Sequence, residues 1–388
     1  MRITPLALLL TLSIRTALAH AQAPVPVATP KPQADSAEAA LAAKLAALVE
    51  KSGLGGGMGA VVADATTGKR LYTLNPEVPR NPASNMKLLT AATALTELGP
   101  EFRLRTSVLG APDPHGHVPV LVVRGEGDPS LSYADLLGIA RRLVDAGVRE
   151  VGEIVVDGSA FDNQVLPPAF EQQPKEIAAF RAAVAAVSVD RSAYTLRLVP
   201  GAEVGAPAQV SLHCPDHFVV DAQLTTSASG APKVSAEQTP RGDKLSLTVR
   251  GAVPIGVRGV GYERRVESPL AYAGDCVRAA LRTQGIGGAQ AVRLGKTDDA
   301  PPLLATHESA PLSVLLQRVG KYSDNFVAEM LLKVIGARTS GAPGSSAAGV
   351  GGGGRRRRPR AVAGRAGGGG GLVGVGVWGR GGGARRRA

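Results

Sequence analysis

A strand-rich segment lies between two helix-rich regions of this 388-residue chain, and that order limits the folds it can adopt. From Phe102 to about Arg265, short apolar runs such as RTSVLG, HVPVLVVRG and KLSLTVRG are separated by Gly, Pro and Asp. This pattern is typical of strands joined by tight turns. Apolar residues at helical spacing precede the segment and return after it. The sequence therefore predicts an α+β protein with a β-rich part inserted into a helix-rich one.

The first residues have the composition of an export signal. Residues 1–23 combine an early arginine, the apolar run PLALLLTLSI and the small-residue stretch ALAHAQA, which predicts a cleaved signal peptide. Residues 24–35 are a Pro-rich linker. No later run reaches about 18 apolar residues, so no transmembrane helix is expected. We expect an exported protein of the periplasm or cell envelope.

The last residues differ from the body of the chain. Residues 346–388 contain ten arginines, many glycines and no acidic residue, which predicts a disordered low-complexity tail. These arginines and the two in the signal region account for the formal net charge of +12. The body is close to neutral, so no nucleic-acid binding is expected of it. Binding to an anionic polymer would depend on the tail alone.

The stretch NPASNMKLLTAATAL places Ser84 three residues before Lys87 at the start of a predicted helix. Residues i and i+3 share a helix face, so the lysine ammonium can meet the serine hydroxyl. Burial lowers the pKa of a lysine and can make it a base. The alternative is a serine helix cap beside a solvated lysine. The motif by itself leaves both interpretations open.

A second motif, Ser323-Asp324-Asn325, lies 236 residues after Lys87. A serine here can pass a proton to a leaving group, and an asparagine can hydrogen-bond a substrate amide and the lysine. The alternative is a turn or helix cap, for which all three residue types are suited. The order Ser-x-x-Lys and then Ser-Asp-Asn favours catalysis, because both belong to the motif set of penicillin-recognising serine enzymes.

With both motifs present, the chain resembles the class C penicillin-binding proteins. These are serine D-alanyl-D-alanine carboxypeptidases and endopeptidases with large domains inserted into a β-lactamase-like core. The resemblance runs from about Gly53 to about Ala348. It rests on ordered blocks that include GEGDPSL, EIVVDGSAFD, AVSVD and ESAPLSVLLQRVGKYSDNFVAEML.

The resemblance implies a domain plan. A transpeptidase-like catalytic domain, with helices packed on an antiparallel sheet, would comprise residues 36–105 and 266–345. The β-rich inserted domains would occupy residues 106–265. Within the catalytic domain, residues 36–53 have helical spacing, and GMGAVVADATTGKRLYTLNP has the pattern of a hairpin.

The resemblance also implies an activity, that of a serine-type D-Ala-D-Ala carboxypeptidase acting on peptidoglycan stem peptides and acylated by penicillins. Ser84 would form the acyl-enzyme, and Lys87 would take its proton. Ser323 would pass a proton to the departing D-Ala, and Asn325 would orient the substrate amide. No cofactor or metal is expected. Carboxypeptidase and endopeptidase activity are not distinguished, and the oligomeric state is open.

A third motif of the set, Lys-Thr-Gly, does not follow Ser323. The nearest match, GKTDD, precedes it, and Asp298 replaces the glycine, so we interpret Lys296 as part of a surface turn. We expect an aberrant or truncated C-terminus, as from a frameshift. A catalytically impaired peptidoglycan-binding homologue is one alternative, and a secreted protein that binds anionic polymers through its tail is another.

The chain has two cysteines, Cys214 and Cys276. An exported protein can form a disulfide, but residues this far apart cannot be paired without geometry. Two unpaired, buried small side chains are an equally consistent interpretation.

Overall fold

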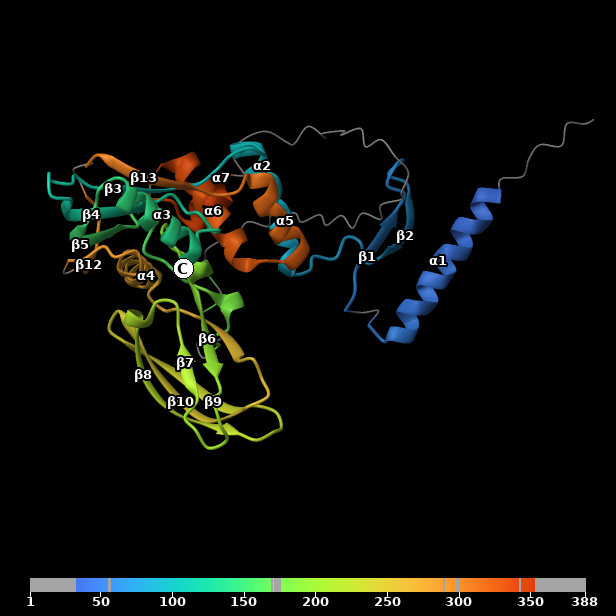
Figure 1. The fold of residues 1–388 in the computed structure, drawn as a ribbon. Helices are drawn as coiled ribbons and strands as arrows, with labels where there is room; N and C mark the ends of the chain where they lie inside the picture. Colours follow the sequence, from blue (N-terminus) through green and yellow to red (C-terminus); the bar gives the residue numbers. More distant parts are fainter. Residues whose placement is uncertain are drawn as a thin grey trace, which may run out of the picture. The chain divides into compact units, whose positions relative to one another are not determined.

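The computed structural model describes residues 33–54, 57–168, 170, 176–288, 290–297, 301–341 and 343–352. The predicted signal peptide and most of the predicted linker and tail lie outside these residues. The described chain has the α+β composition that the sequence predicts (Figure 1). It divides into two compact units, with the boundary between Asn81 and Pro82, and each is described by itself. None of the described helices is long and apolar enough to span a membrane.

The first unit contains a helix and a hairpin, as predicted. Helix α1 (Gln33–Ser52) begins three residues before the predicted start and ends just before Gly53, whose φ of 68° stops the helix. Strands β1 (Ala60–Ala63) and β2 (Arg70–Leu74) pair antiparallel. The connecting turn is fixed by Asp64, whose Oδ1 accepts the N–H groups of the two following threonines at 3.0 and 2.7 Å.

The second unit contains a mixed five-stranded sheet in the order β12-β5-β4-β3-β13. Strands β4 and β5 are parallel, so the chain must cross over between them, and helix α3 makes this connection. One face of the sheet packs on α3 and α4. We call this part the inserted sheet. Its elements are β3 (Arg105–Leu109), β4 (His117–Gly125), α3 (Tyr133–Asp145), β5 (Glu150–Asp157), α4 (Pro269–Thr283), β12 (Ala291–Leu294) and β13 (Leu303–Glu308).

The inserted sheet corrects the predicted domain boundaries. The resemblance places residues 266–308 in the catalytic domain, yet β12 pairs with β5 and β13 pairs with β3. They therefore complete a sheet that starts at Arg105. The prediction was wrong because the helical spacing of α4 gives no information about strand partners more than 100 residues upstream.

Between α3 and α4 the chain forms a module of two three-stranded sheets, ordered β11-β6-β7 and β8-β10-β9 (Figure 1). We call it the β-module. Its strands are β6 (Ala193–Val199), β7 (Gln209–Ser211), β8 (Phe218–Ser227), β9 (Lys233–Arg241), β10 (Lys244–Pro254) and β11 (Val260–Arg265). Cys214 and Cys276 form a disulfide that links the residue before η5 (Pro215–His217) to α4. The unpaired interpretation of these cysteines is therefore wrong.

The remaining part of the second unit is a cluster of helices, which we call the helix cluster. It consists of α2 (Met86–Leu98), α5 (Leu312–Tyr322), α6 (Asn325–Ser340) and α7 (Ser346–Gly352). Ala94, Leu315, Phe326 and Leu331 are among the apolar side chains buried between its helices and the neighbouring loop. The strands that the structure describes in the second unit belong to the inserted sheet or the β-module. The hairpin β1–β2 of the first unit is the part of the predicted catalytic sheet that the described residues contain.

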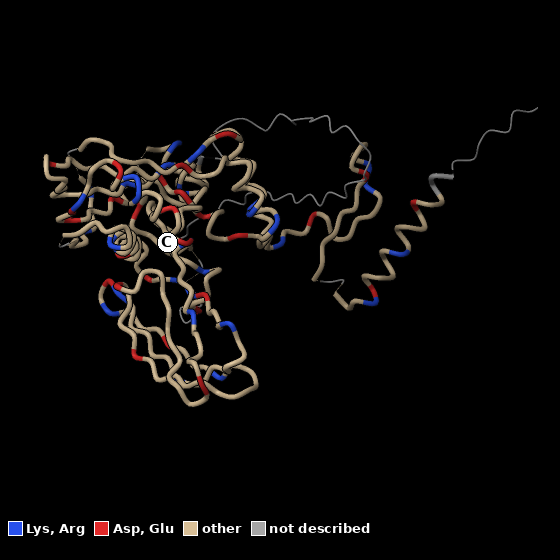
Figure 2. The backbone as a smooth tube through the Cα atoms, in the orientation of Figure 1, with Lys and Arg blue, Asp and Glu red and all other residues tan. Residues whose placement is uncertain are grey.

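Helix α7 lies in the range for which the sequence predicts a disordered tail. The prediction of disorder rests on the low complexity of the tail and its lack of bulky apolar residues at a regular spacing. The small residues of α7 pack by close backbone approach instead, since a Cβ at Gly349 would lie 2.1 Å from the carbonyl oxygen of Leu332 on α6. Residues 346–352 of the predicted tail therefore form a helix that packs on α6. Acidic and basic residues are interspersed over the second unit, in agreement with a body near neutrality (Figure 2).

Candidate active site

Ser84 lies in the turn that starts α2. The turn η1 (Ala83–Asn85) follows Pro82, and Ala83 has a φ of 45°, a conformation that non-glycine residues rarely adopt. Asn85, rather than Ser84, occupies the N-cap position of α2. The Ser84 side chain is exposed and points toward Lys87, which lies in the first turn of the helix. The helix-cap alternative for Ser84 is therefore wrong.

Lys87 contacts two serine hydroxyls. Its Nζ donates to Ser84 Oγ at 3.0 Å and to Ser323 Oγ at 3.3 Å, although Ser323 is 236 residues away. Burial lowers the pKa of the Lys87 ammonium from its ordinary value, and the negative charge of Asp324 opposes this effect. The ammonium is therefore partly desolvated beside a hydroxyl, as a lysine base must be.

The Ser-Asp-Asn motif forms the corner between α5 and α6. Ser323 ends α5 in the left-handed conformation, with φ 53° and ψ 40°. Asp324 is the N-cap of α6, and its Oδ1 accepts the N–H of Val327 at 3.2 Å. Asn325 is the first residue of α6. The capping alternative for this motif is therefore correct. The same corner places Ser323 Oγ 3.3 Å from Lys87 Nζ.

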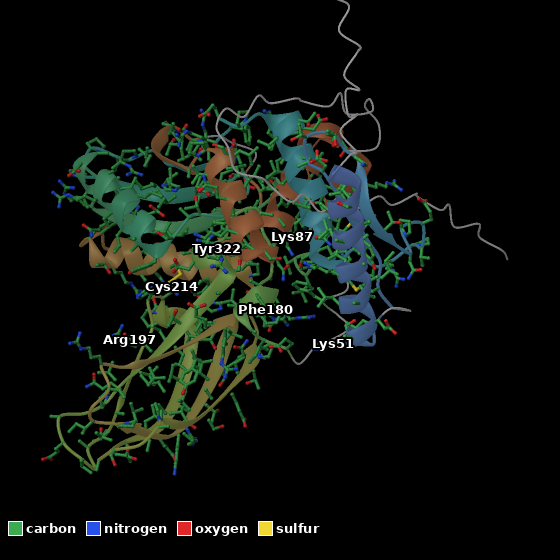
Figure 3. The ribbon with its side chains drawn as sticks, turned by 90° about the vertical axis from the view of Figure 1, so that its right-hand side faces the viewer. Lys51, Lys87, Phe180, Arg197, Cys214 and Tyr322 are labelled. Atoms are coloured by element: carbon green, nitrogen blue, oxygen red, sulfur yellow. A yellow bond between two sulfur atoms is a disulfide. The ribbon has the colours of Figure 1, made fainter. Side chains whose placement is uncertain are left out.

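Asn325 contacts a neighbouring loop. Its Nδ2 donates to the backbone oxygen of Phe180 in η3 (Ala179–Arg181) at 3.0 Å. The side-chain amide of Asn325 therefore hydrogen-bonds to the loop and not to Lys87. Phe180 and Tyr322 are both exposed, at 57% and 64%. They and Lys87 are labelled on neighbouring elements of the second unit in Figure 3.

Asp324 is a site residue that the sequence reasoning did not single out. It is 8% exposed, and its Oδ2 lies 3.6 Å from Arg191 Nε and 3.5 Å from Arg318 Nε. Its place inside the Ser-Asp-Asn motif was the available signal. Nothing in the local pattern around Arg191 indicates a partner on α6. Lys296, in contrast, follows β12 of the inserted sheet, outside the helix cluster that carries Lys87.

The chemistry that this geometry allows is nucleophilic. A serine hydroxyl is a weak nucleophile until a neighbouring base takes its proton. Here the candidate base reaches the candidate nucleophile and a second hydroxyl at once. A proton taken from Ser84 can therefore be passed on through Ser323. The site has the arrangement of a serine acyl-transfer centre with a lysine base.

Comparison with known proteins identifies the family. Residues 41–355 match the D-Ala-D-Ala carboxypeptidase 3 (S13) family, and the chain belongs to it. It is 36% identical over 313 residues to a D-alanyl-D-alanine carboxypeptidase from Actinomadura sp. (strain R39), covering 76% of this chain and 57% of the relative. It is 25% identical over 256 residues to the D-alanyl-D-alanine carboxypeptidase DacB of Haemophilus influenzae, covering 65% of this chain and 53% of that one. The chain thus spans little more than half the length of these relatives.

The fold agrees with the family. The crystal structure of penicillin binding protein 4 (dacB) from Haemophilus influenzae superimposes with a TM-score of 0.62 at 23% sequence identity. The superposition covers 76% of this chain and 66% of that structure. The predicted resemblance to this group of proteins is confirmed, and so is the predicted fold class.

Proposed function

We propose that this protein is a serine-type D-Ala-D-Ala carboxypeptidase of the cell envelope that cleaves peptidoglycan stem peptides and is acylated by penicillins. The observation that carries the proposal is the position of Lys87 Nζ, 3.0 Å from Ser84 Oγ and 3.3 Å from Ser323 Oγ. Membership of the D-Ala-D-Ala carboxypeptidase 3 (S13) family supports the substrate class.

In the proposed acylation, neutral Lys87 accepts the proton of the Ser84 hydroxyl as Oγ attacks the carbonyl carbon of the penultimate D-Ala. The tetrahedral intermediate then collapses, and its C–N bond breaks. The proton moves from Lys87 through the Ser323 hydroxyl to the nitrogen of the departing D-Ala. An ester of Ser84 remains, with Lys87 neutral again.

In deacylation, a water molecule attacks the ester carbonyl while Lys87 accepts its proton. The ester C–O bond breaks, and the proton returns to Ser84 Oγ. A penicillin acylates Ser84 by the same first step, in which the β-lactam C–N bond breaks. Its leaving group stays attached to the acyl group, so the ester persists long enough to be detected.

The protonation state of Lys87 sets the rate of acylation in this scheme. An ordinary lysine is almost fully protonated at neutral pH. Burial lowers the pKa of Lys87, which increases the fraction of enzyme with a free amine. Asn325 lies at the start of α6, one residue from the Asp324 cap, and we assign it the role of orienting the substrate amide.

We also propose export from the cytoplasm. Peptidoglycan lies outside the cytoplasmic membrane, and residues 1–23 have the composition of a signal peptide. The buried disulfide between Cys214 and Cys276 supports an oxidising compartment.

The test is acylation of the purified full chain by a fluorescent penicillin, with the labelled residue located by mass spectrometry. We expect a label on Ser84 that Ser84→Ala abolishes and Lys87→Ala slows by at least about a hundredfold. Arg141→Gln, an exposed position on α3 that pairs with Asp145, is the matched control and should label normally. Release of D-Ala from a stem-peptide analogue tests hydrolysis. A folded wild-type chain that does not label would refute the proposed activity.

A further inference from the structure

The turn that precedes the β-module has an unusual backbone. Three consecutive non-glycine residues have positive φ, with 49° at Asp190, 59° at Arg191 and 51° at Ser192. The left-handed region is unfavourable for residues with a Cβ, and they seldom adopt it in succession. Such a conformation persists where the surrounding structure enforces it, and it is concentrated at functional sites. The turn is therefore a candidate for a role in the site.

The surroundings of the turn enforce its conformation. The N–H of Asp190 donates to Leu131 O at 2.9 Å, and the N–H of Tyr133 donates to Asp190 Oδ1 at 3.1 Å. On the other side, the N–H of Val266 donates to Ser192 O at 2.9 Å. The turn is thus fixed to the start of α3 and to the segment before α4.

The side chain in the middle of the turn reaches the Ser-Asp-Asn corner. Arg191 Nε lies 3.6 Å from Asp324 Oδ2 and makes no hydrogen bond to the residues that the structure describes. Arg318 approaches the same oxygen from α5 at 3.5 Å. The other carboxylate oxygen, Oδ1, caps α6. The Asp324 carboxylate therefore faces two cations, one from the turn and one from α5, and at the same time caps α6.

This arrangement acts on the proposed base. Asp324 directly follows Ser323, whose hydroxyl contacts Lys87 Nζ. Asp324 is also the charged group whose field acts on the Lys87 ammonium. Any change in the position or charge of this carboxylate therefore reaches both the proton relay and the base.

We propose that Arg191, presented by the left-handed turn, is a positioning residue of the active site that acts through Asp324. It holds the Asp324 carboxylate so that the α5–α6 corner keeps Ser323 within hydrogen-bond distance of Lys87. Its role in catalysis rests on the proposed function, but its coupling to Lys87 does not. Because one cation facing one oxygen suffices for this contact, a lysine should replace Arg191.

The experiment is a double-mutant cycle in the full chain with Arg191→Gln, Asp324→Asn and the double variant, together with Arg191→Lys. Arg318→Gln tests the same carboxylate from a residue outside the left-handed turn. Arg141→Gln is the control for loss of an exposed arginine, and circular dichroism checks that each variant folds. Two quantities are measured: the rate constant of acylation by penicillin, and the pH midpoint of Lys87 from competitive labelling with an amine reagent.

We expect Arg191→Gln to acylate about tenfold more slowly, since small displacements of catalytic groups cost about this much or more. Arg191→Lys should stay within about threefold of wild type. In the Asp324→Asn background, Arg191→Gln should change the rate by less than about twofold, because its effect is transmitted by the carboxylate. The Lys87 midpoint should rise in Arg191→Gln and in Arg318→Gln and fall in Asp324→Asn.

Three results would overturn the proposal: wild-type behaviour of Arg191→Gln, effects that multiply in the double variant, or an Arg191→Lys variant as slow as Arg191→Gln. If the wild-type chain does not acylate, the proposed function fails, and the Lys87 midpoint decides this inference by itself. An elevated midpoint in Arg191→Gln that disappears in the Asp324→Asn background then supports the coupling. An unchanged midpoint in Arg191→Gln refutes it.

Discussion

Removal of the Cys214–Cys276 disulfide should strongly destabilise the second unit. The two cysteines are 62 residues apart in sequence, and both are fully buried. Closing a loop of this length in the unfolded chain gives about 4 kcal/mol of stabilisation in the chain-entropy treatment. For a unit of this size, each kcal/mol corresponds to about 2–4 °C. Cys214→Ala/Cys276→Ala should therefore lower the melting temperature by roughly 10 °C.

The assay is thermal and urea unfolding of the purified variants, followed by circular dichroism. The single variants Cys214→Ala and Cys276→Ala should be destabilised nearly as much as the double variant, since either one breaks the cross-link. Hydrogen exchange should increase first in β8 and η5, which the disulfide ties to α4. A double variant that melts within about 2 °C of wild type would refute the reasoning.

Three further predictions concern the helix cluster. The rate constant of penicillin acylation should rise with pH up to the pKa of Lys87. Because burial lowers this pKa, the rise should end below the pH at which a free lysine titrates. A flat profile would exclude Lys87 as the base. Lys333→Met should lower the free energy of unfolding in urea by about 2 kcal/mol, since it leaves the Asp162 carboxylate without its partner. The Lys333 side chain is 1% exposed, but Asp162 is 28% exposed and keeps part of its hydration. The double variant Lys333→Met/Asp162→Asn should recover part of the lost stability. Gly349→Ala should lower the free energy of unfolding by about 1–3 kcal/mol, because its Cβ would overlap the backbone of α6. Gly351→Ala, whose Cβ would have nothing within 4 Å, should be neutral in the same measurement. Equal stabilities of the two variants would show that α7 does not pack as described.

Local patterns predicted the local structure well. The helix α1, the hairpin β1–β2 and the helix α2 all lie where apolar spacing and turn residues placed them. The contact of Ser84 with Lys87 also follows from spacing, because an i, i+3 pair at a helix start meets whatever surrounds it. These features depend on backbone geometry over a few residues.

Local patterns do not predict structure where a segment's partner lies far away in sequence. Residues 266–308 have helical and turn character, yet β12 and β13 complete a sheet begun at residue 105. The residues of α7 are too small to signal a buried helix, and only the adjacent surface of α6 gives them a place to pack. A periodicity of side chains reports which face of an element is buried but not which element covers it.

The sequence by itself determined the order of the elements, the Ser84–Lys87 pair and the family-specific motif order. The tertiary structure decided the contact between Lys87 and Ser323, the pairing of Cys214 with Cys276, and the placement of Arg191 beside Asp324. The physical reason is the same in each case. A short spacing fixes a distance through the covalent backbone, whereas a long one leaves the distance to the packing of the whole unit, which no local pattern records.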